Sequence, residues 1–356
     1  MVKILGEDYS RNDLAMRLGH LSQLAGIRMM ELRDGSEAGV RIAEVRTGSG
    51  LRFQVSLDRG MDVSVAEYKG IPLAWRSPAG DVNPRFYDPR GLGWLRSFPG
   101  GLMTGCGLSQ AGAPSVDEGE ELGLHGRLSH LPAFDVRSTE GWNGDHCTFR
   151  LEGFVREYSV FGVNLLLHRT IETSLGSSQI TFRDVVKNEG TGRSPIMMLY
   201  HINLGWPLLD KGGRILLSAK SVAPRDAEAQ KGLEQAKEIP KPIPGFKEQV
   251  FQYDLNEDRE GLSAVLLENS RLDLGFGLRF RKKELPKFNE WKMTAEGMYV
   301  LGLEPANCHT KGRAAERAAG TLQFLEPGED REFVVQTAIL EGEDERTSFI
   351  KKNELK

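Results

Sequence analysis

Apolar and polar side chains alternate with a period of two over much of the 356-residue chain, and this periodicity is the strongest constraint on its fold. In the segment LRFQVSLD, Leu51, Phe53, Val55 and Leu57 alternate with polar neighbours. The alternation resumes at residues 61–65, after the break formed by the sequence DRG. Successive side chains of a β-strand point to opposite faces of a sheet, so this pattern predicts two strands joined as a hairpin.

Similar alternating runs recur to the end of the chain. They are HCTFRLEGFV, VNLLLHRTIET, SQITFRDVVKN, GRILLSA, RLDLGFGLRF, MYVLGL, TLQFLEPG and REFVVQTAIL. Most of them are bounded by Gly, Asn, Asp or Pro, which supply the backbone conformations of turns. The 41 glycines also fit a chain that turns often. We therefore predict an all-β, mainly antiparallel fold with few short helices.

Two segments have helix-forming composition. DLAMRLGHLSQLAG, at 13–26, predicts a short helix, whereas PRDAEAQKGLEQAKEI, at 224–239, has little apolar face. Because strand patterns continue on both sides of it, we interpret 222–247 as a surface excursion between strands. The simplest organisation is one β domain comprising the whole chain, 1–356, with its core at about 40–342.

Composition excludes several classes of function. The chain is 39% hydrophobic and carries a formal charge of -4, which gives no reason to expect a nucleic acid or an anionic membrane as partner. No apolar run approaches the roughly 18 residues of a membrane span, and the N-terminus turns polar after a few residues. We expect a soluble, cytoplasmic protein. The sequence leaves the oligomeric state open, a homodimer included.

The three cysteines, Cys106, Cys147 and Cys308, form no CxxC pair. Neither a disulfide framework nor a thiolate zinc site is therefore indicated, and we interpret the cysteines as small buried side chains.

Three residues stand out as candidates for acid–base chemistry. His125 lies in GLHGRLSH, outside any strand pattern, and His201 follows the apolar run IMMLY. Glu304 ends the apolar run YVLGL and precedes a proline, so we predict that His201 and Glu304 both lie at strand ends. A carboxyl group in apolar surroundings has a raised pKa, which suits a general base. A satisfied core histidine and an exposed strand-end acid remain the alternative interpretations.

Planar donors and aromatic rings near strand ends are what a sugar site needs. Arg59 follows a strand in SLDRGMD, and Trp75, Trp94 and Trp291 lie in loop-like or strand-end contexts. Arginine can donate to hydroxyl groups, and an aromatic ring can pack against the apolar C–H face of a sugar. A surface ion pair and core tryptophans are the alternatives. Metal binding is only weakly indicated, because His125 and His130 form neither HxH nor HxxxH and have no carboxylate between them; His130 is interpreted as a supporting residue.

The order of these motifs resembles the aldose 1-epimerase family, the galactose mutarotase-like proteins, over roughly residues 50–340. The motifs are LHG at 124–126, VVKNEG at 185–190, HINLG at 201–205, the Glu304 strand and LQFLEPGEDREF at 322–333. The resemblance is closest to a poorly characterised branch marked by LDRGMD, GGLMTGCGL, LHGRLS, YHINLGWPLLD and YVLGLEPAN.

This resemblance implies a large antiparallel β-supersandwich that binds a monosaccharide and interconverts its α and β anomers without a cofactor or metal. It implies Glu304 as general base, His201 as general acid and His125 as a hydrogen-bonding group near the ring oxygen or C1. The residues expected to bind the sugar are Arg59, Arg127, Asn203, Trp291, Lys292 and Trp75, with surface positions as the alternative for Asn203 and Lys292.

The chain also departs from the better-known members of that family. HINLG lacks the usual aromatic pair after the histidine, and the familiar substrate-binding aspartate has no clear counterpart, so the identity of the sugar is open. Two other functions compete with epimerisation. One is a metal-dependent sugar isomerase of cupin type, and the other is a non-catalytic carbohydrate-binding protein on the same scaffold. The first would use His125, His130, His201, Glu304 and His309 as its metal ligands.

Overall fold

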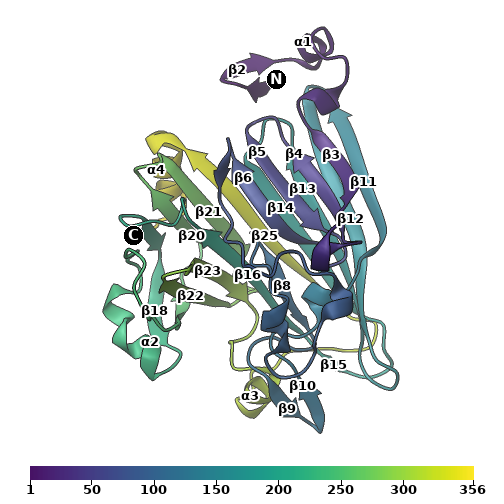
Figure 1. Ribbon diagram of the computed structural model, residues 1–356, viewed down its shortest axis with the longest axis vertical. Helices are drawn as coiled ribbons and strands as arrows, with labels where there is room; N and C mark the ends of the chain where they lie inside the picture. Colours follow the sequence, from purple (N-terminus) through teal and green to yellow (C-terminus); the bar gives the residue numbers. More distant parts are fainter.

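The computed structural model describes all 356 residues, and most of its strands lie in two facing layers (Figure 1). The first layer is an eight-stranded sheet in which every neighbouring pair of strands is antiparallel. In spatial order its strands are β11 (Phe134–Asn143), β12 (His146–Tyr158), β13 (Asn164–Ser174), β14 (Gln179–Asn188), β25 (Asp330–Glu341), β21 (Leu274–Arg281), β20 (Leu262–Asn269) and β17 (Arg214–Leu217).

The second layer combines a six-stranded and a five-stranded sheet, which meet at a bridge between Val63 and Met103. The six strands, in order, are β18 (Ala219–Pro224), β19 (Gln249–Leu255), β22 (Lys287–Ala295), β23 (Met298–Ala306), β16 (Met197–Gly205) and β8 (Thr104–Leu108). The five strands are β3 (Gly26–Glu31), β4 (Arg41–Arg46), β5 (Leu51–Ser56), β6 (Asp62–Tyr68) and β7 (Ile71–Pro72).

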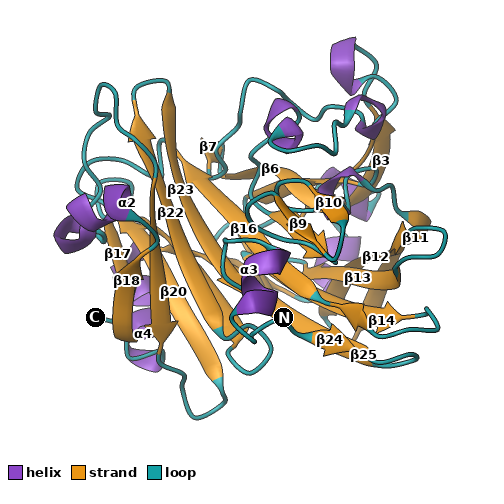
Figure 2. Ribbon diagram, turned by 90° about the horizontal axis from the view of Figure 1, so that it is seen from below, coloured by secondary structure: helices purple, strands orange, loops and turns teal.

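Three two-stranded ribbons and four short helices complete the fold, and the helices lie outside the sheets (Figure 2). The ribbons pair β1 (Val2–Ile4) with β2 (Glu7–Tyr9), β9 (Ser115–Asp117) with β10 (Glu120–Leu122), and β15 (Ser194–Pro195) with β24 (Phe324–Leu325). The helices are α1 (Arg11–Ala15), α2 (Ala227–Lys231), α3 (Arg313–Ala318) and α4 (Gly342–Lys352). None of these helices has the length and apolar composition needed to cross a bilayer.

The main core lies between the two layers and contains 54 buried apolar residues, contributed by all three large sheets. In β16, Tyr200, Ile202 and Leu204 belong to this core, whereas Leu199 packs in a separate cluster outside it. Alternate side chains of a strand point to opposite faces, so His201 points away from the core. The outer face of the six-stranded sheet is therefore where the candidate residues gather.

The predicted all-β antiparallel fold is confirmed, as is the hairpin of β5 and β6. The segment 13–26 forms a shorter helix than predicted, because α1 ends at Ala15 and only a 3-10 turn follows at Leu21–Gln23. The predicted excursion begins later than expected, since β18 continues to Pro224. The three cysteines are free and buried.

Candidate active site

One line of register across the six-stranded sheet carries polar side chains from adjacent strands. Gln252 of β19 lies opposite Asn289 of β22, which lies opposite Glu304 of β23. On the next strand, β16, the Nε2 atom of His201 lies 3.2 Å from Oε1 of Glu304. Side chains directly opposite each other on neighbouring strands have Cβ atoms about 4.5–5.5 Å apart. We call Gln252, Asn289, Glu304 and His201, which share one face of the sheet, the polar row.

His201 and Glu304 lie inside their strands and not at the strand ends that the sequence predicted. β16 continues for four residues beyond His201, to Gly205, and β23 continues through Pro305 to Ala306. Pro305 still occupies a regular register position, opposite Phe288. Both candidate groups are consequently held by strand pairing on either side.

The His201–Glu304 pair is almost fully buried, and burial controls its protonation. The side chains retain 6% and 3% exposure, so solvent still reaches the pair. Burial raises the pKa of Glu304 to about 8, an effect that the positive charge of Arg225 partly opposes. Burial lowers the pKa of His201 to about 4. Both charged forms are disfavoured, so near neutral pH the pair holds one proton in total, on Glu304.

His125 is the third member of the cluster. The centroid of its ring lies 5.6 Å from that of His201 and 4.7 Å from that of Trp94. Burial, reinforced by the neighbouring His201, lowers the pKa of His125 to about 3, so the imidazole is neutral. Its Nδ1 atom is buried and has no hydrogen-bonding partner. Its φ of 57° lies in the left-handed region, which non-glycine residues occupy mainly where surrounding structure imposes it.

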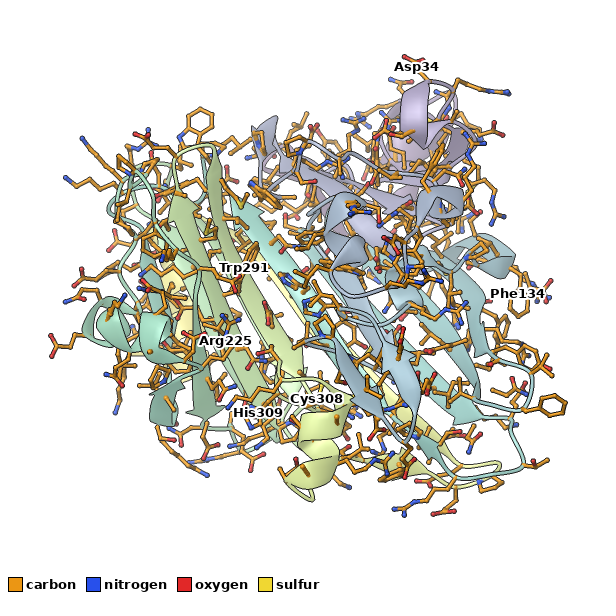
Figure 3. All side chains as sticks on the ribbon, turned by 60° about the horizontal axis from the view of Figure 1, so that its bottom comes forward. Asp34, Phe134, Arg225, Trp291, Cys308 and His309 are labelled. Carbon is orange, nitrogen blue, oxygen red and sulfur yellow. The ribbon has the colours of Figure 1, made fainter.

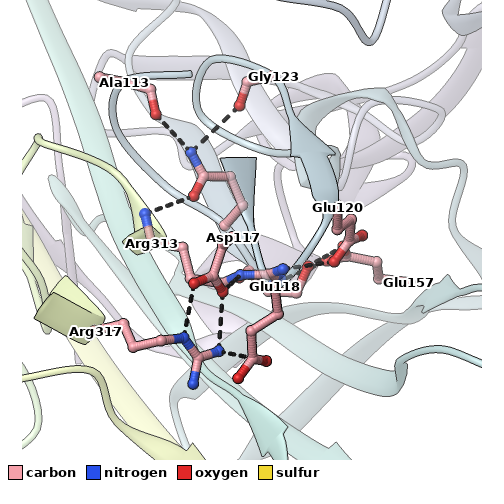
Figure 4. Close-up of polar contacts among 10 residues, drawn as sticks. Ala113, Asp117, Glu118, Glu120, Gly123, Glu157, Arg313 and Arg317 are labelled. Carbon is pink, nitrogen blue, oxygen red and sulfur yellow. Dashed lines mark hydrogen bonds and ion pairs between the residues drawn. The ribbon is translucent and has the colours of Figure 1, made fainter. Parts of the chain in front are cut away.

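Surrounding hydrogen bonds hold His125 in this conformation. The backbone N–H of His125 donates to the carbonyl of Gly112, and the His125 carbonyl accepts from the N–H of Gly107. The side chain of Gln110 accepts from the N–H of Arg313, at 2.8 Å, and Arg313 donates to Asp117 at 2.7 Å (Figure 4). Gln110 also donates to the carbonyl of Gly123 at 3.4 Å, and Arg313 begins α3, shortly after β23, so this network ties the His125 loop to the chain that follows Glu304.

Two glycines are required by the site. Gly126 has a φ of 73°, and a Cβ atom there would lie 2.2 Å from the carbonyl oxygen of Gln110. The glycine of the LHG motif is therefore needed for the backbone to pass. A Cβ atom on Gly302 would lie 2.9 Å from Cβ of Trp291 and 3.0 Å from Oε1 of Glu304. The absence of a side chain at 302 leaves space beside the carboxyl group.

Aromatic side chains surround the imidazole of His201. The ring centroids of Trp291 and Phe98 lie 5.2 Å and 5.4 Å from that of His201. Trp75 meets Trp291 edge to face at 6.4 Å, and both of these tryptophans are half-buried. The predicted Trp75 and Trp291 are therefore brought together beside the pair, with part of each ring accessible.

A second charged group lies at the β18–β19 end of the site. Arg225 donates from Nε to Asp226 at 2.8 Å and from Nη2 to Glu248 at 2.9 Å. The other carboxylate oxygen of Glu248 accepts from the indole N–H of Trp291 at 3.0 Å. Figure 3 labels Arg225, Trp291 and His309, which belong to the green part of the chain. This end of the site thus holds one cation between two carboxylates.

Arg59 makes no hydrogen bond to His125, His201 or Glu304. Its side chain is buried, with Nη1 donating to the carbonyl of Val82 at 2.6 Å and Nη2 donating to that of Ser97 at 2.8 Å. The guanidinium also contacts Nε2 of His130 at 3.3 Å. Arg59 thus supports loops behind the site, and the expected contact with sugar hydroxyls is not open to it. The sequence placed it correctly after a strand but could not reveal the loops that enclose it.

Lys292 is likewise unavailable to a sugar at this face. It follows Trp291, so it points to the opposite side of β22. Its Nζ donates to the carbonyls of Gln235, Ala236 and Glu238, at 2.7, 3.0 and 2.6 Å. The side chain therefore fastens the excursion 225–248 to the sheet.

The other two predicted sugar-binding residues differ in their surroundings. Arg127 is exposed. Asn203 is fully buried and lies two residues beyond His201, on the same face of β16. Its Nδ2 donates to the carbonyls of His201 and Gly101, at 2.9 and 3.0 Å, and its Oδ1 has no partner. Asn203 therefore supports the backbone of His201 and retains one free acceptor.

The candidate metal ligands do not form a metal centre. No group of three or more His, Cys, Asp and Glu side chains is arranged to hold an ion. His130 stacks on Tyr87 with ring centroids 3.8 Å apart, and its Nε2 lies 2.8 Å from Oγ of Ser97. The metal-dependent alternative therefore lacks the ligand cluster that it requires, whereas His130 has the supporting contacts that the sequence predicted.

A separate hollow of about 790 Å³ lies between the loops at 158–164 and 189–195. Its three arginines are already paired: Arg313 and Arg317 bind Asp117, each at 2.7 Å, and Arg193 binds Glu326 at 3.2 Å. This hollow therefore offers no histidine and no unpaired arginine.

Sequence reasoning missed three residues of the site: Asn289, Gln252 and Arg225. Asn289 had a detectable signal, because it lies two positions before Trp291 in KFNEWKM and therefore shares its face of the strand. Asparagine is also uncommon in strand interiors. Gln252 and Arg225 had no local signal, because only the register of β18, β19 and β22 places them near Glu304.

Comparison with known proteins supports the fold. The family model described as "Domain of unknown function (DUF4432)" matches residues 37–339. No curated protein matches the sequence. A protein from Klebsiella pneumoniae described as a "putative aldose 1-epimerase" is 27% identical, with a TM-score of 0.88 over 92% of this chain and 86% of that chain.

Two more distant solved structures share the fold alone. A galactose mutarotase-like protein from Clostridium acetobutylicum is 12% identical, with a TM-score of 0.64 over 90% of this chain and 99% of that one. The galactose 1-epimerase of Lactobacillus acidophilus is 13% identical, with a TM-score of 0.55 over 89% and 99%. The resemblance expected from the sequence motifs is thereby confirmed.

Proposed function

This chain belongs to the DUF4432 family, and from that premise we propose that it is an aldose 1-epimerase-like enzyme that interconverts the α and β anomers of a monosaccharide. The observation that carries the proposal is the 3.2 Å contact between Glu304 and His201, within the polar row and beside His125. The likeness to the Klebsiella protein supports the same reaction class.

The proposed reaction needs one base and one acid. The carboxylate of Glu304 takes the proton of the hydroxyl on C1, the bond between C1 and the ring oxygen breaks, and His201 donates a proton from Nε2 to that oxygen. This gives the open-chain aldehyde. Rotation about the C1–C2 bond presents the other face of the carbonyl, and the reverse proton transfers close the ring as the opposite anomer.

The number of protons on the pair suits this reaction. The pair holds one proton near neutral pH, and it also holds one before and after each ring opening. In the absence of sugar that proton lies on Glu304, since burial raises the pKa of Glu304 to about 8 and lowers that of His201 to about 4. A sugar hydroxyl that donates to Glu304 stabilises the carboxylate, which favours transfer of the proton across the 3.2 Å contact to His201.

The neighbouring residues fit supporting roles. His125 is neutral and has an unpartnered ring nitrogen, so it can hydrogen-bond a sugar oxygen near C1 without adding charge. Trp75 and Trp291 are half-buried and can pack against the apolar face of the ring. Asn203 holds the carbonyl of His201 at 2.9 Å and so orients the acid.

The test is exchange between anomers, measured by NMR for a panel of aldoses, deoxy sugars, uronates and sugar phosphates. We expect the natural protein to accelerate exchange for at least one neutral aldose. Glu304→Gln and His201→Asn should each reduce the acceleration by about 10²–10⁴-fold. Glu290→Gln is the matched control, because Glu290 is also buried on a neighbouring strand but faces the core, where Tyr253 donates to it at 2.8 Å. It should leave exchange unchanged.

Two results would contradict the proposal. Exchange that survives both Glu304→Gln and His201→Asn would exclude these residues as the acid–base pair. Tight sugar binding without any acceleration, across the whole panel, would instead identify a non-catalytic carbohydrate-binding protein.

A further inference from the structure

The amide of Asn289 is buried, and neither end of it has a hydrogen-bonding partner. Asn289 has no exposed surface, and both Oδ1 and Nδ2 are unpartnered. A buried polar atom left without a partner costs about 1–3 kcal/mol. Gln252, directly opposite Asn289 on β19, also has a buried and unpartnered Nε2. Two adjacent amides at the same end of the polar row therefore lack partners within the chain.

The order of residues along the row matches the order of oxygens around a sugar ring. His201 is proposed to serve the ring oxygen and Glu304 the hydroxyl on C1. Asn289 lies opposite Glu304 on β22, whereas His201 contacts Glu304 from the other neighbouring strand, β16. Continuing around the ring from the ring oxygen through C1, the next substituent is the hydroxyl on C2.

We infer that Asn289 binds the C2 hydroxyl of the substrate and Gln252 the C3 hydroxyl, which makes them specificity-determining residues for an aldose with free hydroxyls on C2 and C3. This inference rests on the proposed function, which sets the orientation of the ring. A hydroxyl group both donates and accepts, so a single hydroxyl, or two vicinal ones, can satisfy both ends of the Asn289 amide. Gln252 supplies a further donor from Nε2.

The charges at this end of the row exclude an anionic substituent. Arg225 is the cation next to Glu304, and its guanidinium already binds Asp226 and Glu248. A phosphate or carboxylate at C2 or C3 would meet these two acids and Glu304 with no free cation to bind it. The inferred substrate class is therefore an aldose with free, uncharged hydroxyls on C2 and C3.

The experiment compares anomer exchange of glucose and galactose with that of their 2-deoxy counterparts, as acceleration over the uncatalysed rate. For the better of the two hexoses, we expect the natural protein to favour the 2-hydroxy sugar by about 10²-fold or more in kcat/KM, since a site built to bind a hydroxyl discriminates strongly against its absence. Asn289→Leu, which is similar in size and cannot hydrogen-bond, should reduce this preference to less than about 10-fold, through loss of activity on the 2-hydroxy sugar.

Thr294→Val is the matched control for this substitution. Thr294 is on the same strand, is equally buried and also has an unpartnered side-chain oxygen, but it faces the opposite side of β22. This variant should leave the preference for the 2-hydroxy sugar unchanged. If Asn289→Leu does not fold, Gln252→Leu tests the inference instead, because Gln252 is half-buried and should tolerate the change. The Gln252→Leu variant should show a lower preference for glucose over 3-deoxyglucose than the natural protein.

A binding measurement separates failure of this inference from failure of the proposed function. Tryptophan fluorescence of the Glu304→Gln protein, which retains Trp75 and Trp291, reports the affinity for each sugar without catalysis. Loss of discrimination on Asn289→Leu in this background supports the amide subsite even if no exchange is accelerated. A preference for the 2-hydroxy sugar that Asn289→Leu leaves intact would overturn it.

Discussion

Replacing Glu304 by glutamine should stabilise the protein, and the stabilisation should grow with pH. Burial raises the pKa of Glu304 from its ordinary 4.5 to about 8 in the folded chain. Between these two pH values the folded chain keeps a proton that the unfolded chain has released, so the free energy of unfolding falls as the pH rises. Glutamine has no proton to lose and should not contribute to this fall.

The magnitude follows from the difference between the two pKa values. Each pH unit corresponds to about 1.4 kcal/mol, so ionisation of Glu304 lowers the free energy of unfolding by at most about 5 kcal/mol between pH 4.5 and 8. That is a large fraction of the 5–15 kcal/mol typical of folded proteins, by order of magnitude. His201 acts in the opposite sense: its lowered pKa makes stability fall as the pH drops from 6.5 towards about 4. This contribution is common to the natural protein and the variant, so it largely cancels in the comparison.

The assay is urea unfolding of the natural protein and of Glu304→Gln at several pH values from 5 to 9. The difference in the free energy of unfolding should be small at pH 5, should rise by several kcal/mol and should level off near pH 8. Glu290→Gln provides the comparison, because burial raises the pKa of Glu290 only to about 7; its gain should level off about one pH unit earlier. A difference between Glu304→Gln and the natural protein that stays constant from pH 5 to 9 would refute the assigned burial of this carboxyl group.

Three further outcomes follow from the same contacts. Anomer exchange should be fastest between about pH 4 and 8, where the His201–Glu304 pair holds one proton, and should fall on both sides as the pair gains or loses a proton. A pH profile of the exchange rate that shows no fall above pH 8 would contradict this. Lys292→Met should increase proteolytic cleavage within 225–248, because three carbonyls lose the donor Nζ; mass spectrometry of the fragments locates the cuts. Arg59→Met should lower the free energy of unfolding by about 2–5 kcal/mol, measured in urea, yet leave exchange per folded molecule unchanged, because Arg59 binds backbone carbonyls and makes no hydrogen bond to His125, His201 or Glu304.

The fold could be predicted because its signal is local. Strand alternation such as that of Leu51, Phe53 and Val55 appears wherever one face of a sheet is buried, and in the structure these three residues lie in the core. His201 and Glu304 could be identified for a related reason. Burying an imidazole or a carboxyl group within an apolar run costs free energy unless the group is paired, whatever the arrangement of the strands.

Errors arose where the outcome depended on which face of a strand a side chain occupies or on what covers it. Lys292 and Asn289 lie three positions apart in one strand, and that odd spacing places them on opposite faces of the sheet. Trp291 marked the outer face, so Asn289, two positions away, was the better candidate for contact with a sugar. Arg59 differs, because its neighbours in the sequence are those of an accessible turn, whereas the loops that carry Val82 and Ser97 bury it.

Several buried polar atoms of the candidate site have no hydrogen-bonding partner. Ring nitrogens of His125 and His201 and amide atoms of Asn203, Gln252 and Asn289 are all buried without partners, and all belong to the site. At about 1–3 kcal/mol each, such atoms together offset a substantial part of the folding free energy, whereas apolar residues of the same size would not. The pairing of strands explains how these residues meet but not why they are polar. The proposed hydroxyl-rich ligand would supply donors and acceptors to these atoms, so the empty site would lower stability and the occupied site would satisfy its polar groups.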